Sequence, residues 1–238
     1  MQRLRGRVYR EDGAITDAQL TSDGRHWQPM DASSWHLVAL DEGGGVSGCA
    51  RYSHFPSGAR FHDLGVRTAE IARSDRWGSL VRAAVESQVA RATRERLAFA
   101  EVGGWAISPE KRCTAEALRV ALATYALAQF LGGCVGITTA TFRHHSAQIL
   151  RRIGGRSLVF GELEIPPYFD PQYECEMEVL LFDSAAPNAA YRHAIERLRE
   201  QVGCVTVVAP ECPAALSYPI VAPVPVPAVK PALLPVLS

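Results

Sequence analysis

A strand-to-helix junction constrains the fold more than any other feature of this sequence. Residues 97–108, LAFAEVGGWAIS, form an apolar segment, and PEKRC then leads into an Ala- and Leu-rich segment from about Thr114 to Phe130. The first segment predicts a strand, and its interior glycines, Gly103 and Gly104, are typical of a bulge or of a close ligand approach. The second predicts a helix, with unpaired N–H groups at its start.

The flanking segments predict the rest of the fold. Residues 34–40 and 46–52 predict two strands joined by DEGGG, where three glycines permit positive φ. Helical spacing predicts a long helix that is capped by Ser74 and Asp75 and reaches about residue 95. Further segments predict a strand at 134–140, a helix at 143–153 and strands at 155–165 and 175–182. This order predicts an α/β (α+β) fold, with a mixed, mostly antiparallel sheet flanked by helices.

Composition indicates one domain and a tail. The chain has 238 residues and is 47% hydrophobic, which is enough for a sizeable core. We expect a single domain over residues 1–205 and a tail over 206–238, because the part from Ala209 onward holds eight of the 15 prolines. The tail is either a flexible extension or an arm that packs on its own domain or on a second subunit, so a homodimer stays open.

Charge and cysteine content exclude several classes of function. The 25 basic and 25 acidic residues cancel, which favours a small-molecule substrate over nucleic acid or an anionic membrane surface. Six cysteines without a CxxC pair indicate neither a structural zinc site nor a disulfide framework. The charged start predicts no secretory signal and no membrane span, so we expect a cytoplasmic protein. His144 and His145 would diverge by about 100° on a helix, and no metal site is predicted.

The helix start after Pro109 has the properties of an anion site. Unpaired N–H groups and a partial positive charge gather there, and small residues let an anion approach the backbone. The residues that would hold a phosphate are Arg112, Cys113, Thr114, Ala115, Glu116 and Ala117. An ordinary helix start is the alternative.

This loop resembles the R/Q-x-x-G-x-G/A loop of the GNAT acyltransferase superfamily, which binds the phosphates of an acyl carrier. Arg112 and Ala117 fit the pattern, whereas Ala115 stands where glycine is usual and leaves the donor less room. The segment RHHSAQILRRI resembles the N-x-x-A helix of that superfamily, with His144 and Ala147 at its marked positions. The tyrosine that often serves as general acid would fall near Arg151, so that role is unsupported.

The amino-terminal third resembles the N-acyl amino acid synthases and the acyl-homoserine-lactone synthases, a GNAT branch. The features that carry the likeness are Arg5 or Arg7 with Val8 and Tyr9, Asp31, HLVA at 36–39, and Gly48-x-x-Arg51-Tyr52. The resemblance covers most of the chain except the tail. It implies an N-acyltransferase that moves a fatty acyl group from a coenzyme A or acyl carrier protein thioester to the amine of an amino acid or similar molecule.

The same resemblance suggests roles for individual residues. Glu101 stands where these synthases place a glutamate, and it would accept the amine proton directly or through water. The alternatives are a structural carboxylate or one that orients the substrate ammonium. A backbone N–H of Ala106 or Ile107 would stabilise the oxyanion. Arg51 would bind an acceptor carboxylate, and His36 and Trp105 would complete the substrate site; a surface arginine, a core imidazole and core packing are the alternatives.

One further departure from the family pattern and several alternatives remain open. Gly104 stands where lactone synthases often have an arginine, which argues against a homoserine-lactone product. The cations of residues 143–152, with Lys111 and Arg112, would form a basic rim for an acidic acyl carrier protein or simply a solvated face. Several aromatic side chains would either line an acyl tunnel or pack in the core: Trp77, Trp105, Phe142, Tyr168 and Phe169.

Two other functions are considered. The first is a short-chain acetyltransferase, which a blocked tunnel behind residues 105 and 137 would favour. The second is a non-catalytic binding protein.

Overall fold

A mixed sheet forms the centre of the computed structural model, which describes residues 1–208. Its strand order is β1-β2-β3-β4-β9-β5, and β8 also pairs with β9. The strands are β1 (Trp35–Leu40), β2 (Val46–Phe55), β3 (Ala98–Ile107), β4 (Cys134–Thr141), β5 (Arg156–Ser157), β8 (Tyr168–Asp170) and β9 (Cys175–Asp183). Every described pair in this sheet is antiparallel except β3 with β4. The predicted fold class is therefore confirmed.

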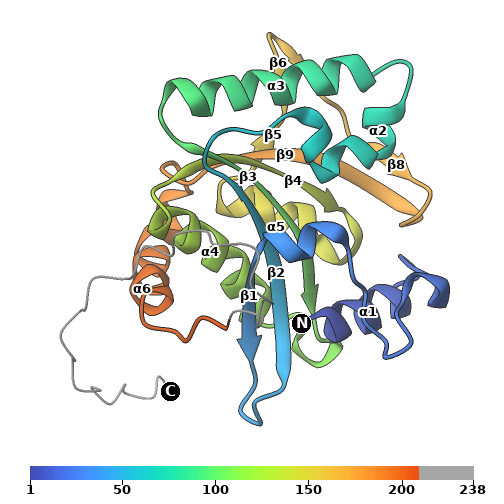
Figure 1. Cartoon of the computed structure of the whole chain (residues 1–238), viewed down its shortest axis with the longest axis vertical. Helices are drawn as coiled ribbons and strands as arrows, with labels where there is room; N and C mark the ends of the chain where they lie inside the picture. Colours follow the sequence, from blue (N-terminus) through green and yellow to red (C-terminus); the bar gives the residue numbers. More distant parts are fainter. Residues whose placement is uncertain (209–238) are drawn as a thin grey trace, which may run out of the picture. The chain divides into compact units, whose positions relative to one another are not determined.

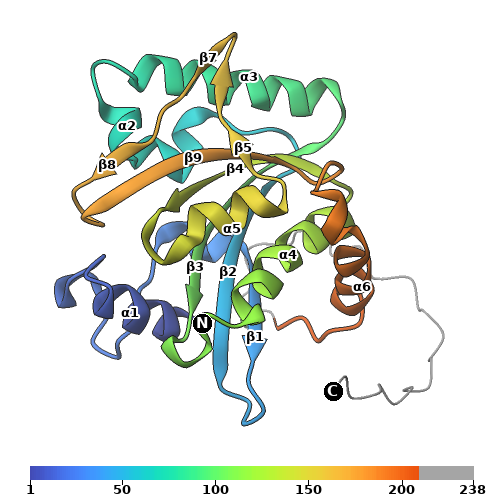
Figure 2. The same ribbon diagram turned by 180° about the vertical axis from the view of Figure 1, so that it is seen from behind.

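Helices cover both faces of the sheet (Figures 1 and 2). On one face, α3 (Gly78–Arg94) packs Val81 and Val85 against Phe99 and Ile137 of the strands. The other face carries α4 (Ala115–Phe130), α5 (Ser146–Ile153) and α6 (Arg192–Val202). The amino-terminal helix α1 (Gln2–Glu11) packs its apolar stripe on the ends of β2 and β3, on the same face as α3. The short α2 (Glu70–Arg73) precedes α3.

The central strands β3 and β4 part from each other at a bulge. Their pairing runs from Ala98–Cys134 to Val102–Thr138 and stops there, although β3 continues beside β2 to Ile107 and β4 continues beside β9 to Thr141. The register between β2 and β3 shifts at this level, and Gly104 has φ of 59°. The last residues of β3 therefore have strand pairing on their β2 side only.

Several predicted elements are present with the expected boundaries. The glycine-rich hairpin joins β1 and β2, and α4 begins directly after Thr114, whose hydroxyl oxygen accepts the Glu116 N–H at 3.1 Å. Thr114 is thus an N-cap, as a small hydroxyl residue before an apolar helix suggests. The tail prediction falls on residues 206–238, nearly all of which lie outside the described residues, as does Cys212.

Three predicted elements were wrong in detail. The long helix begins at Gly78, because the Ser74 hydroxyl accepts the Trp77 N–H and closes a turn after α2 instead of capping α3. The segment 155–165 is not one strand: Gly161, with φ of 60°, turns the chain into a small hairpin of β6 (Val159–Phe160) and β7 (Leu163–Glu164). The helix at 143–153 begins only at Ser146.

His144 and His145 precede this shorter helix in left-handed conformations, with φ of 53° and 60°. The angle expected for two neighbours on one helix does not apply to them. Helix α6, rich in charged residues, was not predicted. Each described helix is too short or too polar to cross a membrane.

Candidate functional site

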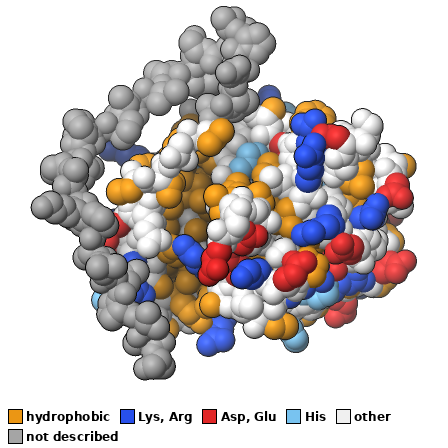
Figure 3. All heavy atoms as spheres, turned by 90° about the horizontal axis from the view of Figure 1, so that it is seen from below, with side chains coloured by type: hydrophobic (Ala, Val, Ile, Leu, Met, Phe, Trp, Pro, Cys, Tyr) orange, Lys and Arg blue, Asp and Glu red, His pale blue; other side chains and the backbone are white. Residues whose placement is uncertain are grey.

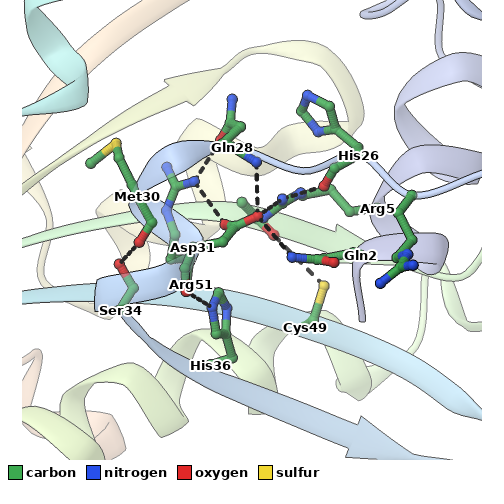
Figure 4. Close-up of polar contacts among 12 residues, drawn as sticks. Gln2, Arg5, His26, Gln28, Met30, Asp31, Ser34, His36, Cys49 and Arg51 are labelled. Atoms are coloured by element: carbon green, nitrogen blue, oxygen red, sulfur yellow. Dashed lines mark hydrogen bonds and ion pairs between the residues drawn. The ribbon is translucent and has the colours of Figure 1, made fainter. Parts of the chain in front are cut away.

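Two buried arginines share one carboxylate beside the bulge (Figure 4). Arg5 of α1, fully buried, donates through Nη1 to Asp31 Oδ1 at 3.0 Å and through Nη2 to Oδ2. Arg51 of β2 donates through Nη1 to the same Oδ1 at 3.2 Å. Burial by itself would raise the pKa of Asp31, but the hydrogen bonds and positive charge of Arg5 dominate and lower it to about 2. Asp31 is therefore ionised, and its charge compensates two cations.

Neutral groups hold this cluster in place. Asp31 lies in a 3-10 turn (Pro29–Ser33), and its Oδ2 accepts the Gln28 N–H at 3.1 Å. His36 Nε2 donates to the Asp31 carbonyl oxygen at 2.9 Å, so the side chain of His36 orients the segment that carries Asp31. Burial lowers the pKa of His36, and burial together with the charge of Arg5 lowers that of His26 to about 4. The structure thus brings together two predicted site residues, Arg51 and His36.

Glu101 lies on the same face of the sheet as this cluster, two residues before Gly103 in β3. The register pairs Arg51 with Gly103 and Ser53 with Glu101, and residues directly opposite in an antiparallel pair share a face. The buried carboxylate of Glu101 accepts the N–H of Gly65 at 2.6 Å and that of Val66 at 2.7 Å. Burial raises the pKa of Glu101, and these two N–H groups oppose the rise. Glu101 therefore anchors the 3-10 turn Gly65–Thr68 to the sheet.

The residues after the bulge alternate between the faces. Trp105 and Ile107 pack toward α4, whereas Ala106 packs against α1. The Ser108 N–H donates to the backbone carbonyl oxygen of Ser47 in β2 at 2.8 Å. Because successive N–H groups of a strand point in opposite directions, the N–H of Ile107 points away from β2, toward the side on which β4 has parted. Trp105 Nε1 is buried and has no partner among the described residues.

The predicted phosphate loop lies at the start of α4. Arg112 Nη2 contacts both carboxylate oxygens of Asp12, at 3.0 and 2.8 Å. Cys113 has φ of 61° and is exposed, and Glu116 Oε1 accepts the Ser47 hydroxyl at 2.8 Å. Ala115 is exposed, and Ala117 packs against the core beneath α4. The loop is therefore a helix N-terminus whose arginine already has an acidic partner.

Arg151 and three of the aromatic residues expected in an acyl tunnel do not join the Arg5–Asp31–Arg51 cluster. Arg151 pairs with the buried Glu178 and also donates to Ser157, so it is part of an internal ion pair. Trp77 and Tyr168 pack in the core under α3, whereas Phe169 is 60% exposed. The aromatic side chains that we expected to line one acyl tunnel therefore do not all lie together. Within residues 1–208, no three His, Cys, Asp or Glu side chains cluster as metal ligands would.

A hydrophobic hollow opens on the lower face of the molecule (Figure 3), the face toward which the end of β3 and the start of α4 point in Figure 1. Two further surface cavities lie elsewhere. One, of about 670 Å³, is beside α1 and Arg25, and the other, of about 450 Å³, is between Phe61 and α3. Neither is lined by a predicted site residue.

Sequence reasoning left the choice between Arg5 and Arg7 open and missed Gly65 and Val66. Arg5, rather than Arg7, is the buried arginine, and the signal was its position on the α1 stripe with Leu4 and Val8. Nothing in the sequence marked Gly65 and Val66 as the partners of Glu101, because they lie in an irregular segment about 35 residues away.

Solved structures share this arrangement of elements, while no family model and no curated protein sequence matches the chain. The CoA-dependent acyl-homoserine lactone synthase BjaI, solved with SAM and isopentyl-CoA, superposes with a TM-score of 0.52 at 14% identity, over 87% of this chain and 82% of that one. This chain and BjaI therefore share a fold. TofI, solved in a ternary complex with an inhibitor and MTA, has the same fold, with a TM-score of 0.50 at 15% identity, over 82% of this chain and 86% of that one. The GNAT-like fold expected from the sequence is confirmed.

Proposed function

We propose that this protein is an N-acyltransferase that moves an acyl group from a thioester to a small-molecule amine. The parting of β3 and β4 at the Gly104 bulge carries this proposal. The parted strands have the start of α4 on one side and the buried Arg5–Asp31–Arg51 cluster with Glu101 on the other. A thioester between the strands would therefore meet an amine held on the α1 face. BjaI, with the same fold, is a CoA-dependent synthase.

The transfer needs a neutral amine and a stabilised oxyanion. The amine nitrogen attacks the thioester carbonyl carbon, the new N–C bond forms, and the C–S bond breaks with its electron pair leaving on sulfur. The N–H of Ile107, which points away from β2, is the donor we assign to the oxyanion. Glu101 is the group we assign to accept the amine proton, directly or through water, and the proton ends on the departing thiolate. The raised pKa of Glu101 suits this exchange.

The donor is a coenzyme A or acyl carrier protein thioester. Both carry a phosphate near the pantetheine arm, and the N-terminus of α4 with Arg112 offers the N–H groups and the guanidinium that such an anion prefers. The side chains present therefore fit a phosphate, although Arg112 faces Asp12 in this structure. Residues from Arg112 to Ala117 would hold the donor, which supplies the activated acyl group.

The acceptor is an amino acid or a similar small amine. Arg51 Nε is buried and has no partner among the described residues, so it can donate to an acceptor carboxylate. A Cβ on Gly104 would lie 2.9 Å from Arg5 Nη1. An arginine at position 104, as lactone synthases often have, would therefore require Arg5 to shift. The absence of that arginine supports a linear N-acyl amino acid as the product.

A long fatty acyl chain is the first candidate for the transferred group, and a short chain is the second. Ile137 and Phe99, near the point where the strands part, are fully buried and packed in the α3-side core. A long chain would have to displace such side chains, whereas an acetyl group would not. Turnover of a series of acyl-coenzyme A donors from two to sixteen carbons distinguishes the two.

The experiment that tests the function compares organic extracts by liquid chromatography and mass spectrometry. Cells would express the wild type, Arg112→Glu, or Arg119→Glu, a matched charge reversal at an exposed position of α4. We expect new N-acyl amides with the wild type and with Arg119→Glu, and their loss with Arg112→Glu. Extracts that all match the empty-vector control, together with no binding of acyl-coenzyme A or acyl carrier protein by the purified protein, would reject the proposal.

A further inference from the structure

The end of α1 carries an acidic residue where a helix disfavours one. Asp12 is the C-cap of α1, beside the negative end of the helix dipole. Its carboxylate is only 17% exposed and faces the guanidinium of Arg112 and the imidazole of His144, which come from two other segments. Arg112 Nη2 contacts both oxygens, His144 Nε2 lies 3.3 Å from Oδ1, and Arg143 Nη1 donates to the backbone carbonyl of Asp12. The environment of Asp12 is therefore set by these partners and not by its own helix.

These partners follow the two strands that part. Arg112 comes after β3, and Arg143 and His144 come directly after β4. Asp12 thus links the chain segments at the ends of both strands, at the edge where a phosphate-bearing donor would enter. Arginine prefers phosphate as well as carboxylate, since its planar guanidinium matches both groups.

Unusual backbone conformations gather around this contact. Of the five non-glycine residues with positive φ among residues 1–208, Cys113, His144 and His145 are in or beside the segments that contact Asp12. A fourth, Glu174, follows Tyr173, whose ring packs edge-on against Tyr9 of α1. Left-handed conformations are costly for such residues and cluster at sites that switch or clamp a ligand.

We propose that Asp12 is an internal anion that closes the donor entrance. A phosphate of the donor would bind by taking Arg112 from the Asp12 carboxylate and Arg143 from the Asp12 backbone carbonyl, which releases the end of α1. The identity of the donor rests on the proposed function, whereas the exchange of one anion for another does not. The ligand is a phosphate ester or diester, supplied by free coenzyme A or by a carrier-bound phosphopantetheine. Asp12 is in this view a specificity device: a ligand without phosphate cannot displace it.

The test uses three ligands of rising phosphate content: pantetheine, 4′-phosphopantetheine and coenzyme A. Each is titrated calorimetrically into the wild type, Asp12→Asn, and Asp17→Asn, a control that removes an exposed carboxylate paired with Arg10. Removing the competing ion pair should tighten coenzyme A binding by roughly three- to tenfold in Asp12→Asn, and 4′-phosphopantetheine should gain in the same direction. Pantetheine affinity and the Asp17→Asn control should not change. Where coenzyme A binds the wild type, equal or weaker binding by Asp12→Asn overturns the proposal.

A second measurement tests the proposal without coenzyme A or its fragments. Hydrogen exchange of amides 9–15 is followed in the wild type with and without inorganic pyrophosphate. The proposal expects pyrophosphate to speed this exchange, because the anion takes the cations that hold the end of α1. Unchanged exchange at high pyrophosphate overturns it. If coenzyme A fails to bind while pyrophosphate still releases α1, the proposed donor is wrong and the internal anion stands.

Discussion

At the scale of single residues, the charge on Asp31 compensates two buried cations. Asp31→Asn keeps the shape but leaves Arg5 and Arg51 without a counter-charge in a site where Arg5 is fully buried. Breaking a buried ion pair in this way typically costs about 3–5 kcal/mol of stability. Urea denaturation measures the loss, with Asp17→Asn as the exposed control. Equal stability of the two variants would contradict the cluster described here.

The role of Glu101 is also decided at the residue scale. As general base, its replacement in Glu101→Gln should lower kcat by about 10²-fold and remove one limb of the pH–rate profile. Stability should also fall, because the amide oxygen can accept only one of the two N–H groups that the carboxylate binds, and the NH₂ cannot accept the other. Glu178→Gln, a buried carboxylate on the same sheet paired with Arg151, is the control. If both variants lose stability and neither changes the pH profile, Glu101 is a structural carboxylate only.

At the scale of elements, the bulge in β3 requires glycine at position 104 for two reasons. Its φ of 59° strains any other residue, and a Cβ would lie 2.9 Å from Arg5 Nη1. Gly104→Ala should therefore cost more than Gly44→Ala, where φ is 79° but nothing lies within 4 Å of the added methyl. Strain alone costs on the order of 1–2 kcal/mol, and the difference between the two free energies of unfolding measures the clash. Equal losses would mean that Arg5 moves aside freely.

Elements were predictable where a local signal determines the boundary. The three glycines of DEGGG and the hydroxyl of Thr114 act on their own neighbours, so the β1–β2 hairpin and the start of α4 were predicted from the sequence. Ser74 misled because its hydroxyl accepts a nearby N–H in a turn as well as it would at a helix start. The Asp12–Arg112 contact joins residues 100 positions apart, and no local pattern could indicate it. The candidate site was therefore predictable by strand and helix, but not by hydrogen-bond partner.

At the scale of the whole molecule, stability should fall as the pH drops through the acid range. The pKa of His26 is lowered to about 4 from its usual 6.5 by burial and by Arg5, with Arg51 acting the same way and Asp31 opposing. Between these values the unfolded chain binds a proton that the folded chain does not, so stability rises with pH across this window and is lost on acidification. The lowered pKa of Asp31 extends the loss from its usual 3.8 down to about 2.

Other groups modify this slope in a known direction. Burial also lowers the pKa of His36 and His54, which adds to the loss, whereas the raised pKa of Glu101 opposes it. His26→Gln should therefore reduce, without abolishing, the dependence of the free energy of unfolding on pH between 6.5 and 4. Urea denaturation at several pH values in this window measures the slope for both chains. An unchanged slope in His26→Gln would show that the imidazole becomes protonated in the folded protein as readily as in the unfolded chain, which its burial beside Arg5 forbids.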